Sequence, residues 1–121
     1  MSEPKRILRQ LPKVLIYPQP YWHQEAEVIG NRAGLEALRD AITRALGNGL
    51  DEAEVYCTDG EGYGITVLEL CDELLDEMPL PYTDDDAKQQ DRSWPQIVRE
   101  SLSEWKRERY AALSRHKTKG E

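Results

Sequence analysis

The fold of this 121-residue chain is decided by residues 31–49, NRAGLEALRDAITRALGNG. Asn31 can cap a helix, because its side-chain oxygen can accept hydrogen bonds from free N–H groups of the first turn. Gly47 and Gly49 can end that helix, since glycine enters the left-handed conformation at little cost. Between them an apolar stripe recurs at helical spacing: Leu35, Leu38, Ile42, Ala45 and Leu46. The stretch predicts a helix over about residues 32–46 that buries this stripe.

An extended pair is predicted before the helix. Residues 13–17, KVLIY, are β-branched and aromatic, and they lie between Pro12 and Pro18, where a strand can end. Residues 21–29 show a period of two, with Trp22, Ala26 and Val28 on one face. That alternation is typical of a half-buried strand, so Trp22 is expected in the core.

Two more strands are predicted after the helix. Residues 53–58, AEVYCT, alternate apolar and polar side chains, and Asp59-Gly60 is a strong hairpin signal. The return strand, residues 63–70, has apolar side chains on both faces. A strand lying between two others would explain that pattern.

The C-terminal part is predicted to hold a connection and a second helix. Residues 72–91 are acidic, and Pro79 and Pro81 forbid regular structure locally. A helix is expected from near Ser93-Trp94-Pro95, because proline is tolerated in a first turn, and the tail over residues 115–121 is expected to fray. The predicted fold class is α+β, with two layers: a mainly antiparallel sheet of about four strands packed against two helices. A single domain is expected over residues 1–121, with its core over about residues 13–114.

The charge of the chain is concentrated in its middle. The formal net charge is −7, but residues 51–91 hold fourteen acidic residues against Lys88 alone, a net charge of −13, between two basic ends. An acidic protein is a poor ligand for a phosphate backbone, so no nucleic acid is expected as a partner. No stretch approaches the roughly 20 apolar residues of a membrane span, so no membrane association is expected either.

Motifs for chemistry are weak. The glycines of residues 60–64 lack the lysine and the helix of a phosphate-binding loop. His23 and His116 do not form a zinc pattern with the cysteines, and Cys57 and Cys71 are expected to be reduced and buried. The sequence therefore predicts no enzyme, no catalytic, metal-binding or cofactor-binding residue, and no cofactor.

Binding residues are sought among aromatic and acidic side chains instead. Tyrosines are frequent anchors of protein interfaces, and a dense acidic field speeds encounter with a basic partner. Ordinary packing on a sheet face and a solvated acidic surface are the open alternatives. The candidate partner-binding residues are Tyr56, Glu61, Tyr63, Asp84, Asp85 and Asp86, and the expected partner is a protein with a basic surface.

A family resemblance rests on residues 26–38, AEVIGNRAGLEAL, followed by AEVY at residues 53–56. This order of strand, glycine-containing turn and helix start resembles the immunity protein 32 family, small bacterial proteins that neutralise polymorphic toxins. The likeness covers about residues 21–70. Residues 21–24, YWHQ, and 80–84, LPYTD, look like signatures of some other bacterial group, and no chemistry follows from them.

The resemblance implies a cytoplasmic, non-enzymatic inhibitor that occludes a cognate toxin domain. The family has no catalytic residues to carry over. The alternative is a small regulatory or scaffold protein that binds another bacterial protein or itself, and both a monomer and a dimer are compatible with the sequence.

Overall fold

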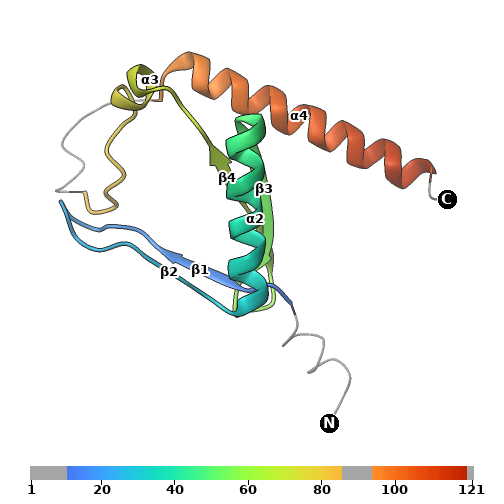
Figure 1. Ribbon diagram of the computed structural model, residues 1–121, viewed down its shortest axis with the longest axis horizontal. Helices are drawn as coiled ribbons and strands as arrows, with labels where there is room; N and C mark the ends of the chain where they lie inside the picture. The colour runs from blue at the N-terminus through green and yellow to red at the C-terminus, as the bar shows by residue number, and fades with distance from the viewer. Residues whose placement is uncertain (1–10, 86–93, 120–121) are drawn as a thin grey trace, which may run out of the picture. The chain divides into compact units, whose positions relative to one another are not determined.

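The computed structural model describes residues 11–85 and 94–119 (Figure 1). By their contacts, these residues fall into two compact units. The first unit comprises residues 11–71 together with 81–85, and the second comprises residues 72–80 together with 94–119. The expected single domain stays a prediction, and Asp86 lies outside the described residues.

Helix α2, Arg32–Asn48, confirms the helix predicted from the sequence and extends it by two residues. The Oδ1 atom of Asn31 accepts a hydrogen bond from the Gly34 N–H at 2.8 Å, so the predicted cap forms. Gly49 takes a left-handed conformation with φ of 91°, and its N–H donates to the Ala45 carbonyl. Gly47, expected to help end the helix, lies within it.

Strands β1, Val14–Tyr17, and β2, Glu27–Gly30, pair antiparallel and form a two-stranded β-ribbon. The predicted strand over residues 21–29 is therefore wrong except at its end. Residues 21–24 turn instead: the Gln24 N–H donates to the Tyr21 carbonyl at 3.4 Å, and His23 has a positive φ of 55°. Trp22 is consequently exposed and is not a core residue, as had been expected.

Strands β3, Leu50–Tyr56, and β4, Gly62–Leu68, form the predicted hairpin. Asp59 accepts a hydrogen bond from the Glu61 N–H at 2.9 Å, and Gly60 takes a positive φ of 86° that suits glycine. Helix α2 packs mainly against β3 (Figure 1).

The α+β class and the antiparallel pairing are confirmed, but the four described strands form two two-stranded sheets rather than one. A single parallel bridge, Lys13↔Tyr56, and the hydrogen bond from the Tyr56 N–H to the Pro12 carbonyl join their backbones. The bridge lies where β1 begins and β3 ends, so β1 runs on past β3 instead of beside it. As a result β4 has one neighbour and is an edge strand, which corrects the expectation that it lies between two others.

The core of the first unit consists of small side chains. Val14, Ala41, Ala53 and Val55 are fully buried together. On α2 the buried residues are Gly34, Ala41 and Ala45, whereas Leu35, Ile42 and Leu46 of the predicted stripe are exposed. The close approach of the chain at Lys13 explains this difference, because a Cβ atom at Gly34 would lie 2.1 Å from the Lys13 carbonyl oxygen. A leucine face could not pack so closely, so the small face of the helix is buried.

The second unit contains the short helix α3, Asp72–Asp76, inside the segment expected to be a connection, and the long helix α4, Gln96–Lys119. The Pro95 carbonyl accepts hydrogen bonds from the N–H groups of Val98 and Arg99, so proline stands at the helix start as predicted. Helix α4 continues past residue 114 into the tail that was expected to fray. No helix in the described residues is long and apolar enough to cross a bilayer.

The close approach at Gly34 can be tested with two alanine substitutions in the same helix. Gly34→Ala places a methyl group against a backbone carbonyl and should lower the free energy of unfolding by about 2 kcal/mol. Gly47→Ala is the matched control, because nothing lies within 4 Å of its Cβ position, and it should raise stability by about 0.5–1 kcal/mol. Urea unfolding measures both values, and equal effects of the two substitutions would contradict the packing at Lys13.

Candidate functional site

The structure separates the sequence-predicted tyrosines. Val55 and Tyr63 are cross-strand partners, so Tyr63 lies on the core face of the β3–β4 sheet. Tyr56 and its partner Gly62 lie on the opposite face, and Glu61 is exposed in the turn. The Tyr63 hydroxyl donates a hydrogen bond to the Val14 carbonyl. The pKa of Tyr63 is raised above its ordinary value, mainly by burial and to a smaller extent by the charge of the nearby Cys57 thiolate. The geometry gives Tyr63 a role in holding β1 against the hairpin.

The predicted acidic residues lie elsewhere, in a segment that pairs with the loop after β1. The Thr83 N–H donates to the Gln19 carbonyl at 3.1 Å, and the Asp84 N–H donates to the Pro20 carbonyl at 3.0 Å. Tyr82 is 9% exposed, so this segment is anchored by an aromatic side chain. The two segments that stood out in the sequence, residues 21–24 and 80–84, are thereby brought together from about 60 positions apart.

Tyr21 and Asp84 form the polar link between these segments. The Tyr21 hydroxyl is hydrogen-bonded to the Asp84 carboxylate, and this bond together with the negative charge of Asp84 raises the pKa of Tyr21. Asp84 is half-buried, and Asp85 beside it is exposed. Of the predicted acidic residues, Asp84 therefore has a positioning contact within the fold, while Asp85 is open to a partner.

A continuous apolar surface lies on α2 and the β-ribbon. Val14, Ile16, Val28 and Gly30 share one face of the ribbon, because residues two apart and cross-strand partners point to the same side. Val14 enters the core, but Ile16 and Val28 stay exposed. A Cβ atom at Gly30 would lie 3.4 Å from the Leu35 side chain, so this face continues onto α2.

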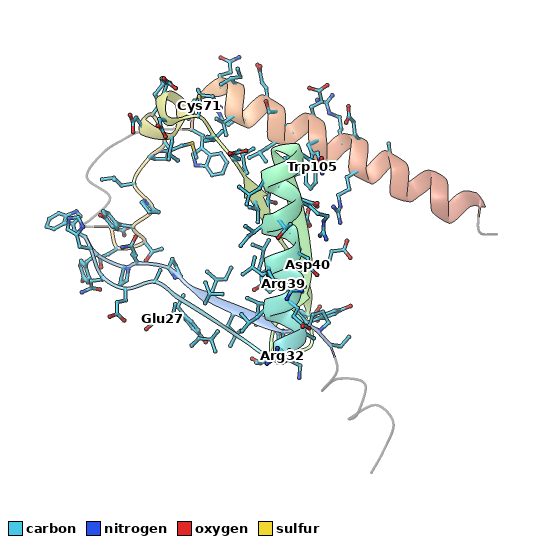
Figure 2. The ribbon with its side chains drawn as sticks, in the orientation of Figure 1. Glu27, Arg32, Arg39, Asp40, Cys71 and Trp105 are labelled. Atoms are coloured by element: carbon cyan, nitrogen blue, oxygen red, sulfur yellow. The ribbon has the colours of Figure 1, made fainter. Side chains whose placement is uncertain are left out.

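We call this region the α2–ribbon surface. Its members are Ile16, Val28, Leu35, Leu38, Ile42 and Leu46. Leu38 is half-buried and the others are exposed, up to 67% at Leu46. Charged residues adjoin it on α2, where Arg32, Glu36 and Arg39 line a hollow together with Leu35. Figure 2 labels Arg32 and Arg39. The sequence pattern assigned the leucines to the core; the run of small residues at 33, 34, 37, 41 and 45 was the signal for a second, closer-packing face.

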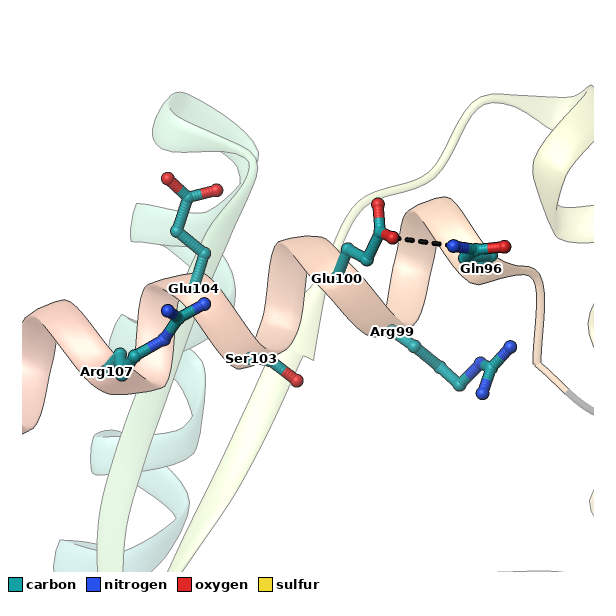
Figure 3. Close-up of a pocket in the computed structure, with 6 residues that line it drawn as sticks. All are labelled: Gln96, Arg99, Glu100, Ser103, Glu104 and Arg107. Carbon is teal, nitrogen blue, oxygen red and sulfur yellow. Dashed lines mark hydrogen bonds between the residues drawn. The ribbon is translucent and has the colours of Figure 1, made fainter.

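Two hollows of the surface are candidate sites for catalysis. One of about 460 Å³ lies between β1 and the hairpin and is lined by Leu15, Ile16, Tyr17, Cys57, Thr58 and Tyr63. Another of about 660 Å³ is lined by one face of α4 alone, with charges of both signs and a hydrogen bond from Gln96 Nε2 to Glu100 Oε1 at 2.7 Å (Figure 3). Neither lining set brings a base to a nucleophile in the way that covalent catalysis uses.

The cysteines and the possible metal ligands do not form a chemical site in the described residues. Cys57 is half-buried and Cys71 is exposed, so the expectation that both are buried is wrong for Cys71. Over residues 11–85 and 94–119, no group of three or more His, Cys, Asp or Glu side chains is arranged to hold a metal ion.

In comparisons with known proteins, no family model, no curated protein and no solved structure matches the chain. The functional argument therefore rests on the surfaces described above.

The hydrogen bond between Tyr21 and Asp84 predicts how the pKa of Tyr21 changes when Asp84 is replaced. A phenol whose pKa is raised in the folded state adds stability below its ordinary pKa of 10.0 and loses it as the pH rises through the raised value. Asp84→Asn removes the carboxylate, so the pKa of Tyr21 should fall towards 10.0, and the stability of the variant should decline less above that pH. The pKa of Tyr63 should stay raised, because its main cause is burial.

The measurement is an NMR titration of the tyrosine ring resonances, with unfolding curves at each pH. An unchanged Tyr21 pKa in Asp84→Asn would contradict the link between the two segments.

Proposed function

We propose that this chain is a protein-binding module that acts by covering a surface of another protein. The observation that carries the proposal is the α2–ribbon surface, where exposed aliphatic side chains of a helix and a β-ribbon adjoin. Monomeric soluble proteins rarely expose large contiguous apolar patches, and those that do commonly use them to bind. An apolar centre with charged residues around it is also the usual anatomy of a protein interface.

The specific form that we propose is a cytoplasmic immunity-type inhibitor of a bacterial toxin. Its support is the resemblance of residues 26–38 and 53–56 to the immunity protein 32 family. An inhibitor of this kind needs a surface that occludes and does not need catalytic groups, so an exposed apolar face would serve it.

The charge of the chain supports a basic partner. Residues 51–91 have a net charge of −13, and such a field raises the rate of encounter with a positive surface. Asp85 is exposed beside Asp84, which Tyr21 and the Pro20 carbonyl hold in place. The acidic segment would then steer the partner, and the α2–ribbon surface would supply the lasting contacts.

A small regulatory or scaffold protein is the second candidate, and the same apolar surface favours it. The neighbouring gene separates the two candidates, because an immunity gene stands beside the gene of its toxin. Co-expression with the product of that gene should relieve its toxicity if the chain is an inhibitor. Binding without relief would support the regulatory or scaffold role.

Two adjacent residues of β2 test the α2–ribbon surface. Val28 lies on this surface and is 49% exposed, whereas Ile29 is 55% exposed on the other face of the ribbon. Val28→Ser should weaken binding to the neighbouring gene product by about tenfold, and Ile29→Ser should change it by less than about threefold. Titration calorimetry measures both, and unfolding curves show whether the fold persists. Equal losses, or a larger loss for Ile29→Ser, would place the binding surface elsewhere.

The acidic segment predicts a kinetic effect. Replacing Asp85 and Asp86 by Asn should slow association with a basic partner and reduce its salt dependence, because exposed charges are screened over about 8 Å at physiological ionic strength. Dissociation should change less, since it depends on desolvated contacts. Binding kinetics at several salt concentrations provide the measurement. If association is insensitive to salt, or the variant associates like the parent, the segment does not steer the partner.

A further inference from the structure

The outer edge of β4 lacks the features that protect most edge strands. Its seven residues, GYGITVL, contain no charged residue and no proline. Natural sheets usually shield an edge with lysine, proline, a short strand or a covering element, because open N–H and C=O groups can pair with another chain. The edge strand β2 is shorter, with four residues, and it includes the charged Glu27.

The hydrogen bonds at the two ends of the hairpin show which groups face outward. The Cys57 N–H donates to the Glu61 carbonyl at 2.8 Å, and the Glu69 N–H donates to the Gly49 carbonyl at 2.9 Å. In an antiparallel pair, residues alternate between bonding to the partner strand and pointing away. Odd-numbered residues of β4 therefore bond to β3, and the even-numbered ones direct their N–H and C=O groups away from it.

The outward residues of β4 are Gly62, Gly64, Thr66 and Leu68. Among the described residues, no hydrogen bond joins the outward backbone groups of these four to another part of the chain. The same alternation holds on β3, where the outward N–H of Tyr56 reaches the Pro12 carbonyl. On that side β1 meets only the end of β3, and the other outward residues of β3 include Glu52 and Glu54. On the β4 side the position of a neighbour is open along the whole strand.

We infer that this position is taken by β4 of a second copy of the chain, paired antiparallel about a two-fold axis at Ile65. In this register Gly62 lies opposite Leu68 of the second copy, and Gly64 lies opposite Thr66 of the second copy. Every outward residue then meets an outward residue, so all of the open backbone groups can pair. The contact uses the same strand on both chains and closes as a dimer.

The side chains of β4 match themselves in this register. Ile65 lies opposite its own copy, and Tyr63 lies opposite Val67, all on the face that carries Ala53 and Val55. Apolar and aromatic cross-strand pairs of this kind stabilise a sheet. Because β4 has no charged residue, pairing with its own copy sets no like charges directly opposite one another. An unrelated strand would fit this edge equally well only by chance.

Two charged residues of β3 bear on this pairing. Glu52 and Glu54 lie on the other face of the sheet, opposite Thr66 and Gly64. The two β3 backbones would be separated by three strand spacings, about 14 Å. Glu52 reaches over Gly64 and brings its carboxylate closer to the second copy, where salt screens it over a Debye length of about 8 Å. Pairing through β4 does not use the α2–ribbon surface, because none of the residues of that surface belongs to β4. The inference is therefore independent of the proposed function.

Two threonine substitutions test the dimer with the purified full chain alone. Thr66→Glu puts a carboxylate on the edge opposite Gly64 of the second copy, beside the Glu52 side chain that covers that glycine. The repulsion should raise the dimer dissociation constant by about tenfold or more. Thr43→Glu is the matched control, because Thr43 is exposed on α2, and it should leave the constant unchanged. Sedimentation equilibrium over a range of concentrations measures the constant.

Amide hydrogen exchange shows whether β4 itself forms the contact. The amides of Gly62, Gly64, Thr66 and Leu68 should become more protected as the protein concentration rises, while those of Tyr63, Ile65 and Val67 should be protected at all concentrations. The second set also shows whether the hairpin stays folded in Thr66→Glu. A chain that remains monomeric, or a dimer whose outward amides exchange equally fast at low and high concentration, would overturn the inference.

Discussion

The junction at Asn31 is the contact on which the rest of the first unit depends. Its Oδ1 atom accepts hydrogen bonds from the N–H groups of Gly34 and Lys13, and its Nδ2 atom donates to the Leu11 carbonyl. Its own N–H donates to the Lys13 carbonyl. One side chain therefore caps α2 and fixes the chain that enters β1, and Pro12 in that chain binds β3 through Tyr56. This junction therefore ties the ribbon, the helix and the hairpin to one another, together with the buried core that Val14 shares with Ala41 and Val55.

The same junction explains why an apolar surface is left over. Gly34 brings α2 so close to Lys13 that only small residues fit beneath the helix, and Ala41 and Ala45 are buried there. The leucines and Ile42 are displaced to the flank of the helix, where Leu35 adjoins the ribbon at Gly30. A core built from alanine and valine buries less apolar area than one built from leucine. A further partner that covers the flank would add the burial that the unit lacks by itself.

The acidic segment and the loop after β1 are connected by backbone bonds and one buried tyrosine rather than by regular structure. Thr83 and Asp84 bond to the carbonyls of Gln19 and Pro20, and Tyr82 is nearly buried. The loop also contains His23, whose positive φ is uncommon for a residue with a side chain and is tolerated where surrounding contacts fix the backbone. These contacts hold part of a highly charged segment in a defined place, which a solvated linker would not require.

The sequence by itself determined the elements whose signals are local. Asn31, Gly49 and the Asp59-Gly60 turn each act through bonds within a few residues, so α2 and the β3–β4 hairpin could be predicted. The structure alone decided which face of α2 is buried, because the clash of Gly34 with Lys13 depends on a contact 21 positions away in the chain. It also decided that residues 21–24 turn towards Asp84 and that β4 lies at an edge, since pairing between distant segments leaves no periodic pattern in either one. Local hydrogen bonds and periodicity are written in neighbouring residues, whereas close approach and strand order depend on which distant segments meet.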